Sequence, residues 1–246
     1  MLGAIIQARM SSTRLPGKVL MPICGKPLIW HIVNRLKSCH IVSEIILAST
    51  VNPADDSLVH WAETNNIKVF RGSEDDVLSR YYYASLLVDT TDILRVTADD
   101  PFKDTGIIVD VFNKYKSEDL DFAYNNKPAS FPEGLDVEIF STAALKRAFL
   151  ESKDPYEREH VTQFFYRHPE VFKQGNYSYV KDLSHLRWTI DTEDDLRMVK
   201  IVYEALYNED QVFGFQDILN LIEKNPVIAI INNNVPRSAM YVKKKI

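Results

Sequence analysis

The chain opens with Leu2-Gly-Ala-Ile-Ile-Gln-Ala-Arg-Met-Ser-Ser-Thr-Arg-Leu-Pro-Gly-Lys18, an apolar run that leads at once into a polar, basic loop. The run Leu2–Gln7 is typical of a strand buried on both faces of a parallel sheet. The loop lacks the glycines of a P-loop or of a dinucleotide-binding fingerprint. Its bases Arg9, Arg14 and Lys18 and its three hydroxyls favour anion binding. A solvated loop with incidental bases is the alternative.

Beyond this loop, short β-branched runs alternate with segments of helical period, the pattern of βαβ units. Ser73 and Asp76 are expected to form a capping box. Right-handed crossovers place the carboxyl ends of parallel strands at one edge of the sheet, where open α/β proteins bind ligands. We expect strands at 44–49, 68–71 and 93–97, and helices at 27–37, 55–65, 75–87 and 104–116.

From about residue 120 onward, the predicted strands and helices no longer alternate regularly. We interpret the chain as one domain, residues 1–246, with a smaller lobe inserted at about 121–185. The lysine-rich segment 241–246 is expected to be a solvated end. We expect strands at 121–125, 136–140, 177–180 and 187–190, and helices at 141–152, 156–166, 193–207 and 215–224.

Composition excludes several classes of protein. The 246 residues are 46% hydrophobic and 26% charged, which is ordinary for a globular chain and excludes disorder, collagen and a small disulfide scaffold. The net charge of -5 supplies no general attraction to nucleic acid or to an anionic membrane. No stretch approaches the roughly 20 apolar residues of a spanning helix, so no membrane insertion is expected. With Cys24 and Cys39 alone and no signal peptide, we expect a reduced, cytoplasmic protein.

Acidic residues follow two of the predicted strands. Asp99 and Asp100 stand just beyond strand 93–97, where one or two carboxylates suffice to hold Mg²⁺. Either is alternatively the N-cap of the helix at 104–116, and for one of the two capping is favoured. The acidic run 191–195 is typical of helix initiation. Asp191 differs from the rest of that run because it lies on the strand side of the turn, as Asp99 does.

These segments together resemble the cytidylyltransferases that make CMP-activated sugar acids. That group includes 3-deoxy-manno-octulosonate and acylneuraminate cytidylyltransferases, and the chain is most similar to the spore-coat polysaccharide branch. The long first motif is the most specific part of the resemblance. The matching motifs lie at residues 5–18, 25–28, 70–77, 95–101, 134–138, 157–162 and 186–191.

The resemblance implies a Rossmann-like α/β fold of the nucleotidyltransferase, or nucleotide-diphospho-sugar transferase, type. Such a fold has a mixed, mostly parallel sheet flanked by helices, and its smaller lobe typically supports a homodimer. The family commonly has glycine where this chain has Ala98, and glutamate or cysteine where it has Asp100. The implied roles are CTP-phosphate binding by Arg9, Ser12, Arg14 and Lys18, nucleoside contact by Ala8 and Arg71, and Mg²⁺ ligation by Asp99 and Asp191.

The predicted function is therefore Mg²⁺-dependent transfer of CMP from CTP to a sugar or sugar acid of the nonulosonate type, with release of pyrophosphate, for surface polysaccharide. Arg9, Arg14, Lys18, Asp99 and Asp191 form the predicted catalytic set. A nucleotide-sugar-dependent glycosyltransferase and an inactive nucleotide-binding scaffold are the alternatives. The basic loop favours the first function over a glycosyltransferase, because it suits a triphosphate better than a diphosphate sugar. The residues predicted to bind the sugar are Glu138, Arg158, His160 and Arg187, with Arg158 and Arg187 as partners for a carboxylate.

Overall fold

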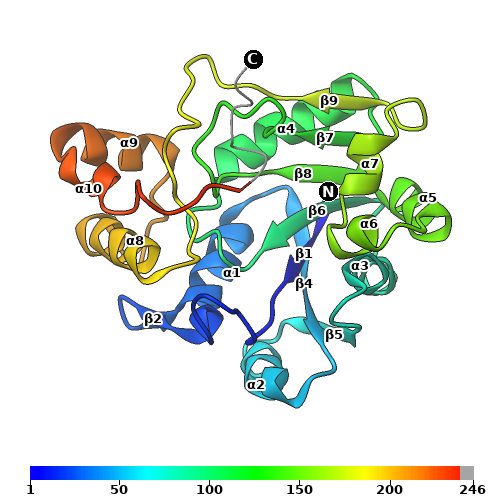
Figure 1. Ribbon diagram of the computed structural model, residues 1–246, viewed down its shortest axis with the longest axis horizontal. Coiled ribbons are helices and arrows are strands. Elements are labelled where there is room, and N and C mark those ends of the chain that lie inside the picture. The colour runs from blue at the N-terminus through cyan, green and yellow to red at the C-terminus, as the bar shows by residue number, and fades with distance from the viewer. Residues whose placement is uncertain (239–246) are drawn as a thin grey trace.

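A seven-stranded mixed sheet forms the centre of the fold (Figure 1). Four neighbouring strands are parallel, a fifth runs antiparallel to the last of them, and two more complete the sheet. The predicted mixed, mostly parallel sheet is confirmed. The order is β5 (Lys68–Gly72), β4 (Val42–Thr50), β1 (Leu2–Gln7), β6 (Asp92–Thr97), β8 (Glu138–Ser141), β7 (Phe122–Tyr124) and β9 (Gln174–Asn176).

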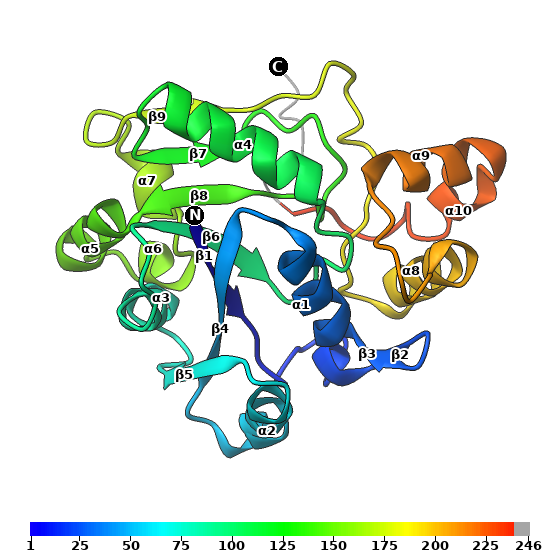
Figure 2. The ribbon, with the colours of Figure 1, turned by 180° about the vertical axis from the view of Figure 1, so that it is seen from behind.

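Helices cover both faces of this sheet (Figures 1 and 2). On one face lie α1 (Leu28–Ser38), α2 (Asp56–Thr64) and α4 (Thr105–Ser117), and on the other α3 (Val77–Ser85) and α5 (Thr142–Glu151). A separate group of helices, α8 (Glu193–Leu206), α9 (Phe215–Lys224) and α10 (Val227–Ile230), packs beside α1. The shorter elements are η1 (Lys18–Leu20), β2 (Pro22–Ile23), β3 (Lys26–Pro27), η2 (Pro53–Asp55), α6 (Pro155–Glu159) and α7 (Gln163–Arg167).

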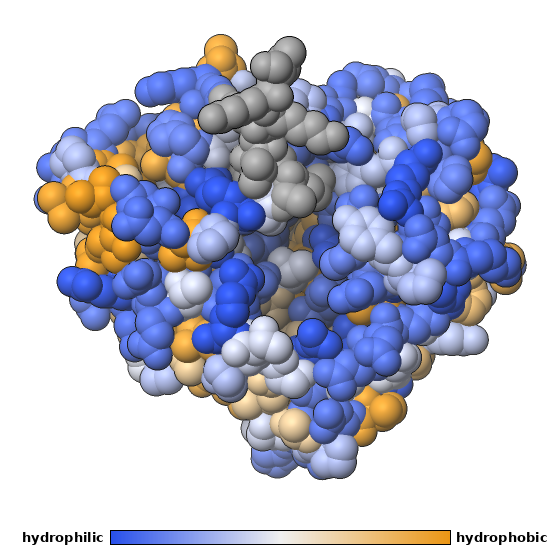
Figure 3. Space-filling model, in the orientation of Figure 1, coloured by the Kyte–Doolittle hydropathy of each residue, from blue (hydrophilic) through white to orange (hydrophobic). Residues whose placement is uncertain are grey.

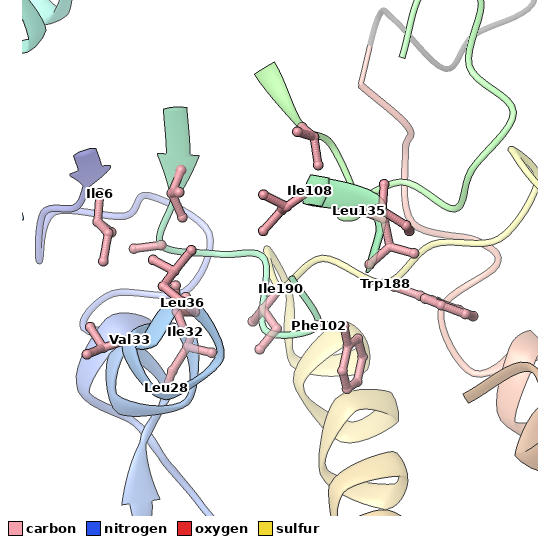
Figure 4. Close-up of a cluster of buried hydrophobic side chains, with 14 of the residues drawn as sticks. Ile6, Leu28, Ile32, Val33, Leu36, Phe102, Ile108, Leu135, Trp188 and Ile190 are labelled. Carbon is pink, nitrogen blue, oxygen red and sulfur yellow. The ribbon is translucent and has the colours of Figure 1, made fainter. Parts of the chain in front are cut away.

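The apolar strand β1 separates two hydrophobic clusters, as its composition predicts. Successive side chains of a strand point to opposite faces. Ile6 therefore belongs to the cluster under α1 and Ile5 to the cluster under α3, and both are fully buried. Figure 4 shows Ile6 above the apolar stripe of α1, and Trp188 near Phe102 in the same cluster. The carboxyl-terminal segment is thus packed into the core that supports β1.

The computed structural model describes residues 1–238, so the predicted solvated end at 241–246 lies outside the described residues. Within the described part of the chain, every helix is too short or too polar to traverse a lipid bilayer. The segment predicted as an inserted lobe, about 121–185, supplies β7, β8 and β9 to the main sheet. Its role in dimerisation stays a prediction.

Three local predictions about strands and helices are wrong. Residues 177–180 form no strand; the pairing segment is β9, and Val180 is 95% exposed with no neighbouring strand to cover it. Residues 187–190 make one isolated bridge, because their backbone bonds go to Glu133 on one side and Asp99 on the other. The single helix at 156–166 is two short helices, since His160 leaves the helical conformation with φ -106° and ψ 51° and the next side chain, Val161, is fully buried.

The predicted capping box is also wrong. Asp76 is itself the N-cap of α3, and its Oδ1 accepts from the backbone N–H of Ser79 at 2.9 Å. Ser73 Oγ accepts from the backbone N–H of Asp76 at 3.0 Å, which makes a turn before the helix. The helix consequently begins two residues later than predicted, at Val77.

Gly134 allows the segment after β7 to approach the run that contains Trp188. Its φ is +104°, and a Cβ there would lie 2.7 Å from the carbonyl carbon of Trp188.

We expect Gly134→Ala to lower the free energy of unfolding by about 3 kcal/mol, because neither backbone segment can move away without strain. Gly25→Ala is the matched control: its φ is +76° with nothing within 4 Å. It should lose only about 1–2 kcal/mol. Urea denaturation compares the two, and equal losses would contradict this account.

Candidate functional site

A buried carboxylate fixes the basic loop that follows β1. Asp55 is 1% exposed, and its Oδ1 accepts from the backbone N–H of Met10 at 2.7 Å. Its Oδ2 accepts from the hydroxyls of Ser49 and Thr50, so the loop is tied to the end of β4. Gly17 closes the loop in a left-handed conformation, with φ 72°. The side chains of the loop are therefore held at the carboxyl edge of the sheet.

Lys18 joins the two predicted metal ligands. Its Nζ lies 3.3 Å from Asp99 Oδ2 and 2.9 Å from Asp191 Oδ1, and it also donates to the carbonyl of Ile190. Burial lowers the pKa of Lys18, but the two carboxylates outweigh burial and raise it. Burial likewise raises the pKa of Asp99, and the ammonium of Lys18 more than offsets this and lowers it. The structure thus brings together two carboxylates that lie far apart in the sequence.

Arg187 holds the carboxylate of Asp191 in place. Its Nη2 lies 2.8 Å from Asp191 Oδ2, its Nε 2.9 Å from Asp195 Oδ1 and its Nη1 2.9 Å from Glu133 Oε1. Burial opposes the ionised form of Asp195, but hydrogen bonds from Arg187 and Asn232 lower its pKa below the ordinary value. Asp195 Oδ2 also accepts from the backbone N–H of Asp191 at 2.9 Å. This network fixes the direction in which the Asp191 carboxylate points.

Two adjoining cavities open on these carboxylates. The first, about 310 Å³, is lined by Ala8, Ser12 and all three bases of the loop. The second, about 500 Å³, is lined by Glu138 and by residues of the segment 133–136. Figure 3 shows a recess with a mainly hydrophilic border in the middle of the face where β1 and β6 end in Figure 1. Both cavities share Thr97, Asp99, His160 and Asp191.

Three predicted site residues line neither cavity. Arg71 donates to the carbonyls of Thr50 and Asn52. Arg158 pairs with Asp76 at 2.6 Å, and Arg187 is 4% exposed behind Asp191. These guanidinium groups hold parts of the fold together in this structure, and their contacts with substrate stay predictions.

Asp100 does not cap the following helix, and neither does Asp99. The N-cap of α4 is Asp104, whose Oδ1 accepts from the backbone N–H of Ile107 at 2.9 Å. Asp100 instead pairs with the buried Lys103 at 2.8 Å. Burial and the neighbouring Asp99 together raise the pKa of Asp100, against the opposing effect of Lys103. The capping alternative considered for this pair is therefore wrong.

The sequence analysis missed several charged residues that line the cavities. Glu74 accepts from Arg9 at 3.1 Å and from Ser11 at 2.9 Å, and a hydrogen bond from Ser11 is the main cause that lowers its pKa. Arg80 lies on the buried face of α3, which also carries Val77 and Tyr81. A charged residue at helical spacing within an apolar stripe was the available signal. Arg95 and Lys103 line the second cavity, each paired with a buried carboxylate.

The donor set fits a hard divalent cation. Asp99 and Asp191 offer two carboxylates that converge on one point, the Nζ of Lys18. Mg²⁺ usually takes one or two carboxylates and completes its shell with water and substrate phosphate. Within residues 1–238 no group of three or more His, Cys, Asp or Glu side chains is arranged to hold a metal ion. The pair therefore fits a metal that is shared with a phosphate, rather than one enclosed by protein.

The fold and the position of the cavities define a class of protein. The Rossmann-like mixed sheet of this chain also occurs in solved nucleotidyltransferases, and its cavities lie at the carboxyl ends of its parallel strands, where such sheets bind ligands. A family model described as cytidylyltransferase matches residues 3–234. The chain belongs to the cytidylyltransferase family, which confirms the resemblance seen in the sequence.

Individual relatives agree with this assignment. The spore coat polysaccharide biosynthesis protein SpsF of Bacillus subtilis is 29% identical over 235 residues, which cover 90% of this chain and 94% of that protein. A 3-deoxy-manno-octulosonate cytidylyltransferase of Geobacter metallireducens is 32% identical over 43% of this chain and 41% of its own length. A solved cytidylyltransferase of Leptospira borgpetersenii superimposes with a TM-score of 0.85 at 33% identity, covering 93% of this chain and 96% of that one.

The buried pair of Arg187 and Asp195 gives a test of the supporting network. Because the pKa of Asp195 is lowered in the fold, its stabilising effect is present above its unfolded pKa of about 3.9 and is lost as the pH falls through the folded-state value. We expect Asp195→Asn to lose about 3 kcal/mol at pH 7, and the difference from wild type to shrink below about pH 4.

Chemical denaturation across this pH range measures the effect. Asp194→Asn is the matched control, because Asp194 lies in the same first turn of α8 but is exposed. It should change stability by less than about 0.5 kcal/mol. A loss at Asp195→Asn that stays constant with pH would contradict the role of the ionised pair.

Proposed function

We propose that this cytidylyltransferase transfers CMP from CTP to a sugar or sugar acid and releases pyrophosphate. One observation carries the proposal: two cavities adjoin, and the carboxylates of Asp99 and Asp191 lie where they meet. A transfer reaction needs two substrates whose reacting atoms are side by side. In this proposal CTP occupies the cavity under the basic loop, the acceptor occupies the second, and the α-phosphate lies at the junction.

On the nucleotide side, the loop supplies the positive charge that a triphosphate requires. Arg9, Arg14 and Lys18 line this cavity together with the hydroxyl of Ser12. Arg14 lies 2.9 Å from Asp191, so its charge sits beside the junction. As the bond to the leaving group breaks, negative charge grows on the pyrophosphate. The three bases stabilise that charge from a loop whose backbone is already held by Asp55.

At the junction, Asp99 and Asp191 are the residues that would hold Mg²⁺. When bound, this ion supplies charge neutralisation at the α-phosphate and lowers the pKa of an attacking hydroxyl. Arg187 keeps the Asp191 carboxylate oriented toward the junction, through a contact of 2.8 Å. Lys18 lies between the two carboxylates and is placed to donate to a phosphate oxygen.

On the acceptor side, the second cavity offers groups that bind hydroxyls. Glu138 is held by Arg95 at 2.6 Å, and its Oε1 accepts from the hydroxyl of Tyr166. His160 reaches both cavities and is the residue placed to contact the attacking hydroxyl. The names of two similar proteins described above, an octulosonate cytidylyltransferase and a spore coat polysaccharide biosynthesis protein, support a sugar-acid acceptor and a role in surface polysaccharide. A nonulosonate-like acceptor is the finer part of the proposal.

A homodimer is part of the proposal. Several apolar side chains near the ends of α3 and α5 are exposed, and Tyr83 and Phe149 of these helices are in ring contact at 5.6 Å. An apolar surface of this kind is typical of a contact between protein chains. The exposed side chains are Tyr83 (46%), Leu86 (62%), Leu87 (44%) and Leu150 (57%).

Neutral isosteres test the two carboxylates. We expect Asp99→Asn and Asp191→Asn each to lower the rate of pyrophosphate release from CTP by at least about 10²–10³-fold, because each removes a carboxylate that would hold Mg²⁺ at the reacting phosphate. Thermal unfolding should show a folded protein in both cases. Asp194→Asn, at an exposed residue that lines neither cavity, serves as the active control. Near-normal rates in both site variants would remove these residues from the reaction.

The choice of substrates is tested by a panel. Pyrophosphate release is measured with CTP, UTP, dTTP, ATP and GTP, each against neutral sugars and sugar acids, with and without Mg²⁺. We expect turnover with CTP, dependent on both Mg²⁺ and an acceptor. Turnover with UTP or dTTP but not with CTP would refute the nucleotide assignment, and hydrolysis of a nucleotide-sugar without pyrophosphate release would favour a glycosyltransferase.

A further inference from the structure

The ammonium of Lys18 lies at the point where the two carboxylates of the site converge. The oxygens that face this point are Oδ2 of Asp99 and Oδ1 of Asp191, and Nζ contacts them at 3.3 and 2.9 Å. A magnesium ion held by both carboxylates has to contact the same two oxygens, at about 2.0–2.1 Å. Two cations at such short range repel each other strongly in a partly buried place. Lys18 and the ion are therefore alternative occupants of one position.

The second oxygen of Asp191 offers a metal ion no alternative. Its Oδ2 contacts Nη2 of Arg187 at 2.8 Å and Nη2 of Arg14 at 2.9 Å. The side chain of Arg187 is 2% exposed and is also paired with two further carboxylates, so its position is fixed. Oδ1 is consequently the oxygen that Asp191 can give to an ion, and Lys18 already contacts it.

The cavities indicate where the ammonium goes when it leaves this position. Asp99 and Asp191 line both cavities, whereas Lys18 lines only the first, which the proposed function assigns to CTP. The lysine side chain is 9% exposed, so a move away from the carboxylates is costly unless another anion receives its charge. A triphosphate is such an anion, and the flexible four-carbon stem of lysine lets the ammonium reach it. A nucleotide in the first cavity therefore frees the two carboxylates as it brings phosphate oxygens to them.

We propose that Lys18 acts as an internal counter-ion that excludes a divalent ion from Asp99 and Asp191 until a triphosphate takes over its ammonium. The inference rests on the proposed function, since it concerns the same nucleotide and the same ion. Its consequence is an order of binding: the carboxylate pair binds the ion together with the nucleotide, and only weakly without it. Binding of the ion and binding of the nucleotide are then coupled through one side chain.

The test is the affinity of the nucleotide-free protein for Mn²⁺, a paramagnetic substitute for Mg²⁺ whose free concentration is measured by electron paramagnetic resonance. We expect Lys18→Met to bind Mn²⁺ on the order of 10–10²-fold more tightly than the wild-type protein, because the position between the carboxylates becomes available. A gain is informative, since damage to the fold would weaken binding. Addition of Asp191→Asn to Lys18→Met should remove the gain, because the ion then loses one of its two carboxylates.

Two matched variants separate the position of the charge from its loss. Lys26→Met removes the same charge from an exposed lysine that lines neither cavity, and should leave the Mn²⁺ affinity unchanged within about twofold. Arg14 contacts Asp191 from a side chain that is 52% exposed, so Arg14→Met should tighten Mn²⁺ binding by less than about fivefold. Lys18→Gln is the second site variant, in case Lys18→Met does not fold, because its neutral amide can still donate to the carbonyl of Ile190.

The outcomes separate this inference from the proposed function. Equal Mn²⁺ affinities of the wild-type protein and the Lys18 variants would overturn the inference. Equal gains from Lys18→Met and Arg14→Met, or a gain that persists when Asp191→Asn is added, would overturn it as well. The proposed function is decided by a different measurement, the Mg²⁺-dependent release of pyrophosphate from CTP by the wild-type protein, and it stands or fails whatever the nucleotide-free variants bind.

Discussion

A single ammonium group joins the parts of this molecule on which its chemistry depends. Nζ of Lys18 contacts Asp99 and Asp191 as well as the carbonyl of Ile190. Lys18 follows the first strand, Asp99 follows β6, and Asp191 belongs to a segment that lies more than ninety positions further along the chain. Without a cation between them, two carboxylates this close would repel each other in a partly buried place. The contact therefore fixes where the carboxyl-terminal third meets the sheet.

Most of the buried charge around this point is balanced locally. Arg187 meets Glu133, Asp191 and Asp195, and Lys103 meets Asp100. Such buried ion pairs add little net stability, but loss of one partner is strongly destabilising. Their value here is geometric, since each holds a carboxylate in one direction before any substrate arrives. A phosphoryl transfer needs little covalent help from the protein. Preorganised charge of this kind is therefore the protein's main contribution to such a reaction.

Because most charged side chains near the site are paired with one another, the partners of each remaining basic residue are informative. Arg9 and Arg14 are exposed and line a cavity, so their charge is available to a ligand, whereas Lys18 is buried between Asp99 and Asp191. Arg158 and Arg71 are occupied by Asp76, Asp56 and backbone carbonyls. A residue type and a motif position therefore do not establish a contact with substrate. The partners already bound to each guanidinium distinguish a residue that supports the fold from one that faces a cavity.

The sequence by itself determined the parallel half of the sheet, the position of the basic loop and the acidic strand ends, because these follow from hydrophobic period and from the handedness of βαβ crossovers. Tertiary structure decided the rest: the antiparallel strand β8, the replacement of a predicted strand at 187–190 by single bonds to Glu133 and Asp99, and the burial of Arg80, whose Nη1 donates to the carbonyl of Ser73. Local patterns show which side chains are buried and which are charged. They carry no information about which distant segment will pack against a buried side chain or pair with a charged one. That choice depends on how the whole chain packs.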